Sequence, residues 1–440
     1  MIYLHVPFCR SFCTYCDFYS EIACKGKEEA AMARWADEVC AEIAARREEI
    51  ISTLDLDTLY IGGGTPSVLP LSVLRRIVER LAVLRDGQRA GPCPVKGPRS
   101  RHCPSEMPVH RGYTEFTIEV NPEDIIERGP EYVQGLLDLG VTRISMGVQS
   151  LDDGILRWMN RRHSADGARK AYLILRGSFA SPGMTGAAQG EISSQDLRHP
   201  RLRGGTAKAV GSSVQGFGAE KSETVGEEIL PCAVSIDLIT GVPGMTVEIL
   251  EKTLEEVISW RPEHISAYQL SIEEGSALAK MIEEGRVTEL GEEECRAQYE
   301  LVCRRLAEAG YRHYEISNWA LPGHEAVHNS AYWTRHPYAG LGPGAHSLIF
   351  YDAAGGPCGR AMPVSGPPFQ WHGTGPLPVA DSRQRRSWNS QQLSGWTSEG
   401  ENLSPEEIHE EEVMLLARTA LGPIPEKDWF IADDIIPSLL

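Results

Sequence analysis

Three cysteines near the start of the chain are the residues best suited to chemistry. Cys9, Cys13 and Cys16 follow the spacing C-x3-C-x2-C within eight residues. A four-iron cluster needs four ligands, so three thiolates would leave one iron open to another molecule. Zinc also takes four ligands, and a second C-x2-C pair is missing, although a scattered Cys or His such as Cys24 could complete a zinc site. Three buried structural thiols are a further alternative, but so short a loop packs three thiols poorly, and an iron–sulfur cluster is favoured.

Short apolar runs that end in Gly, Pro, Asn or Ser predict the strands that position these cysteines. The predicted strands cover 2–8, 58–61, 116–120, 143–148, 234–239 and 264–270. Apolar residues at helical spacing predict helices over 28–51, 71–84, 132–139, 247–260 and 292–309. Strands that alternate with helices favour an α/β fold with a parallel sheet, and six strands favour a barrel, complete or partial. Barrel enzymes carry their chemistry at the C-terminal ends of the strands, where the cysteines also stand.

Three stretches of biased composition interrupt this alternation. Residues 85–112 are rich in Pro, Gly and Arg, 177–231 contain ten glycines, and 352–401 are rich in Gly, Pro, Ser and Gln. We interpret all three as loops or disordered insertions, because they add no periodic apolar content.

A helix signal follows the last of these stretches. Ser404 and Glu407 form a capping box with Pro405 at the first helical position, which predicts a helix through about Leu416. The chain therefore divides into a barrel with its following region, a low-complexity loop and a small, α-rich C-terminal region that we expect to be truncated. These three parts cover 1–350, 351–403 and 404–440.

The charge balance limits the classes of partner. The chain has 440 residues and a formal net charge of −18, which repels phosphate backbones, so nucleic acid is not expected as a partner. It contains no apolar run of the roughly 18 residues that a membrane span needs. Its first residues lack the pattern of a secretory leader. We therefore expect a cytoplasmic protein whose cysteines are kept reduced.

The cysteine motif, with Tyr15 just before the last cysteine, resembles the signature of the radical S-adenosylmethionine (SAM) enzymes. This resemblance implies a partial (β/α)6 barrel with a [4Fe-4S] cluster on Cys9, Cys13 and Cys16. It also implies that SAM binds the open iron and that an electron donor reduces the cluster, which then cleaves SAM to a 5′-deoxyadenosyl radical. The run that includes Gly63, Gly64 and Thr65 follows the second predicted strand and resembles the glycine motif that contacts SAM in this family.

Five further residues extend the resemblance to a coproporphyrinogen-oxidase-like branch of the family. Glu119 and Asp237 are carboxylates on otherwise apolar strands, where burial is costly unless they are hydrogen-bonded. By resemblance these two residues, together with Gln149, Arg161 and the first-strand aromatic Tyr3, contact SAM. The structural alternative for each is a satisfied polar residue, or packing in the first strand for Tyr3. No residue is assigned a catalytic acid or base role.

Two kinds of protein in this branch differ in ways that the sequence can address. The oxygen-independent coproporphyrinogen III dehydrogenase converts two propionates to vinyls, whereas the haem chaperone binds haem and passes it to acceptor proteins. The dehydrogenase has a further cysteine where this chain has Phe18, and the sequence from His328 to Trp333 resembles the chaperone motif H-N-x-x-Y-W. The resemblance therefore favours a haem chaperone with His328 as the axial ligand, with the dehydrogenase as the alternative. A homodimer is a further expectation, and a satisfied core histidine is the alternative for His328.

Overall fold

The computed structural model describes residues 1–22, 26–89, 112–179, 232–359 and 383–439. Within them, the main sheet has the order β11-β1-β4-β5-β6-β7-β8-β10-β9. The six predicted strands are all present, and each pairs in parallel with the next. They are β1 (Ile2–Val6), β4 (Thr58–Gly63), β5 (Glu115–Val120), β6 (Arg143–Gln149), β7 (Ala233–Thr240) and β8 (His264–Gln269). The predicted α/β fold is confirmed.

Three shorter strands extend the sheet at its two edges. β11 (Ala339–Leu341) pairs in parallel with β1, whereas β10 (Asn318–Ala320) runs antiparallel to both β8 and β9 (Arg312–Glu315). Because β11 and β9 stand at opposite ends of the strand order and do not pair among the described residues, the sheet forms a partial barrel.

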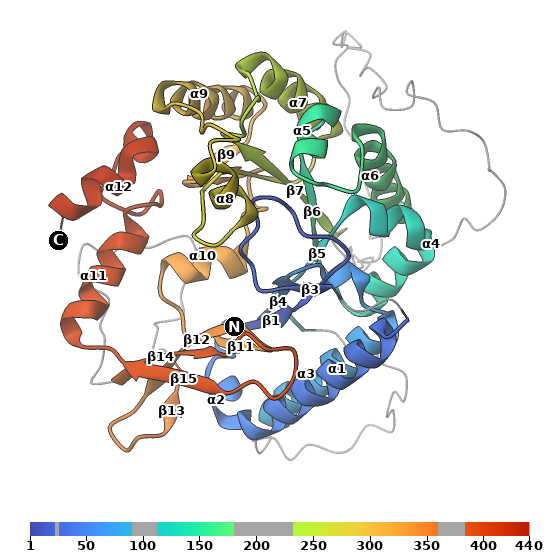
Figure 1. Cartoon of the computed structure of the whole chain (residues 1–440). Helices are drawn as coiled ribbons and strands as arrows, with labels where there is room; N and C mark the ends of the chain where they lie inside the picture. Colours follow the sequence, from blue (N-terminus) through green and yellow to red (C-terminus); the bar gives the residue numbers. More distant parts are fainter. Residues whose placement is uncertain (23–25, 90–111, 180–231, 360–382, 440) are drawn as a thin grey trace, which may run out of the picture.

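Helices cover the outside of the sheet, as Figure 1 shows in a view along the barrel. The helices of this layer are α1 (Glu28–Ala45), α2 (Arg47–Ser52), α3 (Leu71–Arg89), α4 (Pro122–Asp138), α5 (Asp153–Trp158), α6 (Ala165–Phe179), α7 (Val247–Trp260) and α9 (Glu292–Glu308). Two short helices lie at the ends of the barrel: α8 (Ala277–Glu283) bonds to Thr14 at the mouth, and α10 (Val327–Trp333) bonds to Thr58 at the opposite end. The predicted helix over 247–260 has the observed bounds of α7, where Thr246 caps the first turn. The helix predicted over 28–51 is divided at Arg46, and α4 bends at Gly129, whose φ is 71° and which precedes Pro130.

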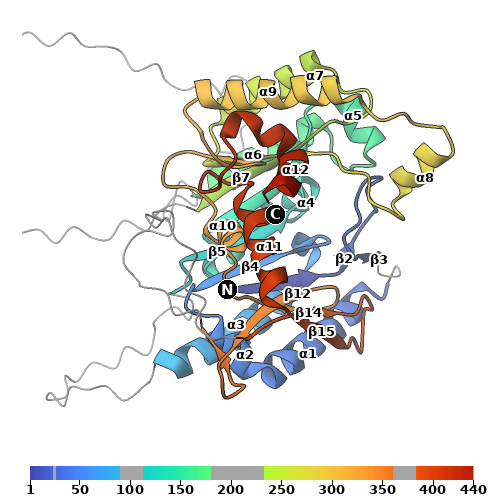
Figure 2. The same ribbon diagram turned by 90° about the vertical axis from the view of Figure 1, so that its left-hand side faces the viewer.

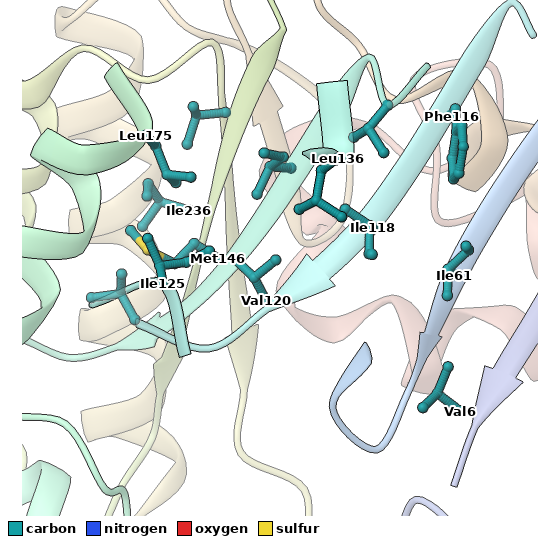
Figure 3. Close-up of a cluster of buried hydrophobic side chains, with 14 of the residues drawn as sticks. Val6, Ile61, Phe116, Ile118, Val120, Ile125, Leu136, Met146, Leu175 and Ile236 are labelled. Carbon is teal, nitrogen blue, oxygen red and sulfur yellow. The ribbon is translucent and has the colours of Figure 1, made fainter. Parts of the chain in front are cut away.

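Alternation along the strands separates an apolar outer face from a polar inner face. Figure 3 shows Ile118 of β5 and Ile236 of β7 on the outer face, among buried side chains of the covering helices. Along each strand, the residues next to these isoleucines point their side chains to the opposite face, because successive residues of a strand alternate. The strand register sets Glu119 beside Ser145, and Asp237 lies on the neighbouring strand β7. Polar side chains from adjacent strands therefore meet inside the barrel.

A second, smaller sheet corrects the expectation of a loop over 351–403. It has the order β13-β12-β14-β15, formed by β12 (His346–Tyr351), β13 (Pro357–Cys358), β14 (Arg383–Asn389) and β15 (Ser398–Asn402). The sequence RQRRSWN of β14 lacks the apolar alternation that marks a strand. Main-chain pairing with the apolar strand β12 stabilises it instead. The remaining part of this stretch, 360–382, lies outside the described residues.

The other two biased stretches are also mostly outside the described residues. Helix α3 continues to Arg89 and α6 to Phe179, so the first few residues of each predicted loop are helical, which corrects the expectation there. The expectation for 90–111 and for 180–231 is not addressed by the structure.

The C-terminal region is helical, as the sequence predicts. α11 (Pro405–Leu416) begins at the predicted capping box of Ser404 and Glu407. Three short helical segments follow, η2 (Glu426–Ile431), α12 (Ala432–Ile435) and η3 (Ile436–Ser438), and Figure 2 shows them beside the barrel. Short elements near the barrel mouth are β2 (Phe8–Cys9), β3 (Glu21–Ile22) and η1 (Pro66–Val68). Among the described helices, none combines the length and apolar character needed to cross a bilayer.

Candidate functional site

A cavity of about 940 Å³ opens at the C-terminal ends of the parallel strands. In Figure 1 the dark blue loop that contains the three cysteines lies across this end of the barrel. All predicted site residues except Tyr3 and His328 line the cavity. They are Cys9, Cys13, Tyr15, Cys16, Gly63, Gly64, Thr65, Glu119, Gln149, Arg161 and Asp237.

The loop from residue 9 to residue 16, here called the cysteine loop, is anchored to distant parts of the chain. The Thr14 N–H donates to the carbonyl of Met159 at 3.2 Å, and the carbonyl of Thr14 accepts from the N–H of Leu278 at 2.9 Å. Asn160 Nδ2 donates to the carbonyl of Phe12 at 2.6 Å. The loop is therefore positioned by the segment after α5 and by α8.

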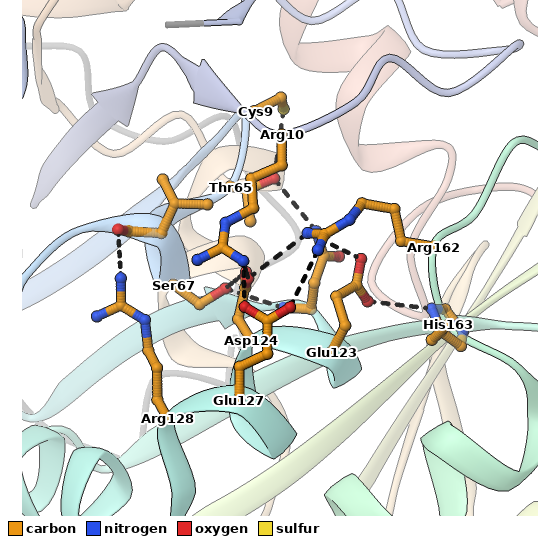
Figure 4. Close-up of polar contacts among 12 residues, drawn as sticks. Cys9, Arg10, Thr65, Ser67, Glu123, Asp124, Glu127, Arg128, Arg162 and His163 are labelled. Atoms are coloured by element: carbon orange, nitrogen blue, oxygen red, sulfur yellow. Dashed lines mark hydrogen bonds and ion pairs between the residues drawn. The ribbon is translucent and has the colours of Figure 1, made fainter. Parts of the chain in front are cut away.

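Ion pairs add a further anchor between the cysteine loop and α4, shown in Figure 4. Arg10 pairs with Glu127 and lies 3.6 Å from Asp124. Arg162 pairs with Glu127 at 3.1 Å and Asp124 at 3.8 Å and also with Glu123 at 3.6 Å, so two arginines and three acids form one network. Asp124 is fully buried and also accepts a hydrogen bond from Ser67 at 2.6 Å.

The three thiols are free, and each is partly buried. Burial raises the pKa of Cys9 and raises that of Cys16 to about 12, so without a metal both stay protonated near neutral pH. Metal binding would displace these protons. Within the described ranges, no three His, Cys, Asp or Glu side chains are close enough together to hold one metal ion. Cys24, named for the zinc alternative, lies outside those ranges.

The glycine run at the end of β4 is required by close contacts. A Cβ on Gly64 would lie 2.8 Å from the carbonyl oxygen of Phe8 and 2.9 Å from that of Val6. Gly63 has a φ of 104°, and a Cβ there would lie 2.7 Å from the ring of His5. Its N–H donates to Glu119 Oε2 at 3.2 Å. Only glycine allows the main chain to pack so closely against the segment from His5 to Phe8 at these positions.

Glu119 is held inside the barrel by hydrogen bonds. The Tyr60 hydroxyl donates to Glu119 Oε1 at 2.6 Å. Burial, together with the nearby Asp237 carboxylate, raises the pKa of Glu119 to about 7, although the hydrogen bonds from Tyr60 and Gly63 act to lower it. Glu119 is therefore a carboxyl group whose charge changes near neutral pH.

Asp237 is surrounded by serine hydroxyl groups from three adjacent strands. Ser145 Oγ donates to its two carboxylate oxygens at 3.0 Å and 2.9 Å, and Ser235 and Ser266 also hydrogen-bond to it. Burial raises the pKa of Asp237 to about 6 despite these donors. The polar network that the sequence analysis considered for this strand is thus present, and it faces the cavity.

Gln149 and Arg161 carry buried polar atoms that lack a hydrogen-bond partner in the described part of the chain. These atoms are Gln149 Oε1 and Arg161 Nε. Gln149 also has a φ of 64°, which is unusual for a residue with a side chain. Arg161 donates through Nη2 to Asn121 Oδ1 at 2.6 Å and to the carbonyl of Gly147 at 2.8 Å, and through Nη1 to Cys13 Sγ at 3.4 Å. Unpaired buried groups of this kind are expected where a polar ligand completes the site.

The two aromatic residues of the predicted site differ in position. Tyr15 lines the cavity, and burial raises the pKa of its hydroxyl group. Tyr3 does not line it: its hydroxyl is 3.0 Å from His5 Nδ1, and its ring centroid is 6.1 Å from that of Tyr60. Tyr3 therefore lies beside the side chain that supports Glu119.

His328 lies away from the cavity, and its surroundings favour the alternative of a satisfied core histidine over the predicted haem ligand. It lies on α10 and is fully buried at the opposite ends of the strands, where Glu115 Oε1 accepts its main-chain N–H at 3.0 Å. Its Nδ1 is 2.8 Å from Thr58 Oγ1 and its Nε2 is 3.0 Å from the Tyr332 hydroxyl. Since both ring nitrogens are hydrogen-bonded inside the protein, neither is open to a haem iron in this structure.

Several residues of the cavity were not singled out by sequence reasoning. Tyr60, Asn121 and Tyr268 are neighbours of predicted site residues or lie one strand away, and period-2 alternation could have placed them on the inner face. Gln391 reaches the cavity from the segment between β14 and β15. No signal in the sequence identified it, because that segment was expected to be a loop without a defined place.

Comparisons with known proteins show which sequences this chain resembles. Residues 3–185 match the model of the radical SAM superfamily. The chain is 30% identical to a protein of Mycobacterium tuberculosis named heme chaperone HemW, over 79% of this chain and 69% of that protein. It is also 30% identical to the protein of the same name from Synechocystis, over 96% and 78% of the two chains.

A solved structure shows the same fold. Coproporphyrinogen III oxidase (HemN) from Escherichia coli superposes with a TM-score of 0.56 at 16% identity, over 94% of this chain and 74% of that enzyme. The cysteine motif, the partial barrel and these relatives lead to one assignment: the chain belongs to the radical SAM superfamily and, within it, to the HemW/HemN family.

Proposed function

We propose that this protein is a haem chaperone that binds a [4Fe-4S] cluster, SAM and haem and transfers haem to acceptor proteins. The observation that carries the proposal is the gathering of three thiols and four polar side chains around one cavity, in a chain whose relatives are named heme chaperone. The polar side chains are Glu119, Gln149, Arg161 and Asp237.

The residues around the cavity fit the cluster and SAM. Cys9, Cys13 and Cys16 would hold three irons, and the cluster when bound supplies one-electron chemistry. Removal of any one thiol would leave two protein ligands and a labile cluster. The guanidinium of Arg161 lies 3.4 Å from Cys13 Sγ and would balance part of the negative charge of a thiolate ligand.

The remaining residues complement the charges of SAM, which carries a positive sulfonium, an ammonium group and a carboxylate. Glu119 and Asp237 would balance the positive groups, and the unpaired Nε of Arg161 would donate to an anionic or carbonyl oxygen. The glycine run with Thr65 lines the cavity, where its main chain would lie beside the ligand. Tyr3 would act through Tyr60 rather than by contact, because it does not line the cavity.

Haem binding is proposed on the names of the relatives, and His328 is not part of it for the reason given above. An electron donor for the cluster and haem-acceptor proteins are the partners that this function requires. A homodimer and a cytoplasmic location stay predictions from the sequence.

The alternative function is that of the coproporphyrinogen III dehydrogenase, whose fold this chain shares. Phe18 speaks against it. This residue stands where the dehydrogenase pattern has a cysteine, and it lines the cavity with 64% of its surface exposed. A phenyl ring at this place cannot ligate a metal or take part in thiol chemistry.

One anaerobic assay separates the two functions. The reconstituted protein is incubated with SAM, dithionite and coproporphyrinogen III, and 5′-deoxyadenosine and porphyrin products are measured by liquid chromatography. In this assay we expect unchanged coproporphyrinogen III. In a separate haem titration we expect a saturable Soret band, and the bound haem should then pass to apomyoglobin. Vinyl products would establish the dehydrogenase instead.

The cluster is tested with a matched pair of variants. Cys13→Ala should lose most of the brown chromophore and bound iron after reconstitution, because two thiols remain. Cys40→Ala, which changes a thiol on α1, should keep both. Full chromophore in Cys13→Ala would overturn the cluster assignment.

A further inference from the structure

Two of the three cysteine sulfurs are joined by a continuous chain of hydrogen-bonding side chains. Cys9 Sγ lies 3.3 Å from Thr65 Oγ1, and Cys13 Sγ lies 3.4 Å from Arg161 Nη1. Asn121 stands between Thr65 and Arg161. Its Nδ2 lies 3.2 Å from Thr65 Oγ1, and its Oδ1 lies 2.6 Å from Arg161 Nη2. The order is therefore Cys9, Thr65, Asn121, Arg161 and Cys13.

The chemistry of the side chains determines the direction of each hydrogen bond. Arginine has donors and no acceptor, so the Asn121 atom that faces Arg161 must be the amide oxygen. The amide nitrogen of Asn121 then faces Thr65 and donates to its hydroxyl oxygen. Since that oxygen is the acceptor there, the Thr65 hydroxyl hydrogen is left to donate to Cys9. Both ends of this hydrogen-bonded path, Thr65 and Arg161, thus direct a donor at a cysteine sulfur.

The position of Asn121 in the fold supports a role of this kind. Asn121 is the N-cap residue of α4, where an asparagine side chain normally accepts a hydrogen bond from the first turn of the helix. Here the side chain makes no cap hydrogen bond, and Pro122 follows at the first helical position. The side chain instead reaches Thr65 and Arg161, which come from two other segments of the barrel mouth.

We propose that Asn121 is a positioning residue for the iron–sulfur cluster: it aligns Thr65 and Arg161 so that both donate to cysteine ligands, which raises the reduction potential of the cluster. The inference rests on the proposed function, since it requires a cluster on these cysteines. One electron from an external reductant adds one negative charge, which spreads onto the ligand sulfurs. Donors directed at the sulfurs stabilise that charge and favour the reduced state.

The experiment measures the midpoint potential of the reconstituted cluster without SAM, by anaerobic titration with dithionite followed by electron paramagnetic resonance. Asn121→Leu removes the central amide, although Asn121 touches no cysteine, and should lower the midpoint potential. Thr65→Val should also lower it, and Thr65→Ser, which keeps the hydroxyl group, should restore it. Ser271→Ala is the control, because Ser271 lines the same cavity but bonds to Glu273 and not to the side-chain path.

Coupling between the positions gives the sharpest result. In the Asn121→Leu background, Thr65→Val should shift the potential by less than it does alone, because Thr65 is no longer aligned. Full additivity, or an unchanged potential in either single variant with normal iron content, would overturn the inference. A purely structural role of Asn121 would reduce iron content without moving the potential. If the wild-type chain forms no cluster, the proposed function fails and this inference fails with it.

Discussion

Glu119 is a carboxyl group that changes its charge near neutral pH, and the consequence for stability has a definite sign. Its pKa rises from 4.5 to about 7 on folding, mainly through burial. Between these values the folded chain binds more protons than the unfolded chain, so the free energy of unfolding decreases as pH rises from 4.5 to 7.

We therefore expect Glu119→Gln to remove much of this decrease, on the order of 3 kcal/mol between pH 4.5 and pH 8. Urea unfolding of the protein without added ligands, at several pH values, measures it. Glu399→Gln on the exposed strand β15 is the control and should leave the profile as in the wild type. A Glu119→Gln profile as steep as that of the wild type would contradict the assignment.

His328 illustrates a motif residue whose contacts are structural. His328→Ala deletes a buried ring that bonds to Thr58 and Tyr332, so we expect the free energy of unfolding to fall by roughly 2–4 kcal/mol. The Soret band of bound haem, measured per folded molecule, should be unchanged. Loss of that band with normal stability would reinstate His328 as the axial ligand.

At the scale of elements, the glycine run sets how closely β1 and β4 approach at the cavity. A Cβ on Gly64 would contact main-chain oxygens of both Val6 and Phe8, which cannot move without separating the strands. We expect Gly64→Ala to cost about 1–3 kcal/mol in the free energy of unfolding and to reduce iron incorporation. Gly177→Ala, on α6 with no atom within 4 Å of the added Cβ, should be neutral or stabilising. Equal effects of the two changes would show that the close approach is unimportant.

At the scale of the whole molecule, an ion-pair network joins the second sheet, the segment that follows α10, and α11. Glu411 of α11 pairs with Arg335, which is 3% exposed, and with Arg386 of β14. Arg386 also pairs with Glu401 on β15, in a more exposed position. This network connects the C-terminal region to β14 and β15, the strands that the sequence did not predict.

Removing the charge of Glu411 takes one ion-pair partner from Arg335 and one from Arg386. Glu411→Gln should lower the free energy of unfolding by about 2–4 kcal/mol and increase proteolysis of the C-terminal region. Glu401→Gln should cost less than about 1 kcal/mol, because solvent screens that pair. Similar values for the two variants in chemical unfolding would show that the network does not hold the region in place.

The sequence by itself determined the six parallel strands, most of the helices and the cysteine loop, because strand alternation, helical spacing and cysteine spacing are local patterns. It also identified Glu119 and Asp237, which line the cavity, since carboxylates on apolar strands are conspicuous, whereas Gln149 and Arg161 came from the family resemblance. The second sheet escaped prediction because β14 is polar and depends on pairing with β12, a contact between distant segments.

Only the tertiary structure decided which side chains complete the site and which lie elsewhere. Asn121 was visible in the sequence, but its link between Thr65 and Arg161 depends on three segments that meet at the barrel mouth. His328 carried a persuasive motif, yet its ring nitrogens are occupied by Thr58, 270 residues away, and by Tyr332. Whether a polar atom is open to a ligand depends on neighbours that the chain brings together only on folding, and local sequence patterns do not encode those neighbours.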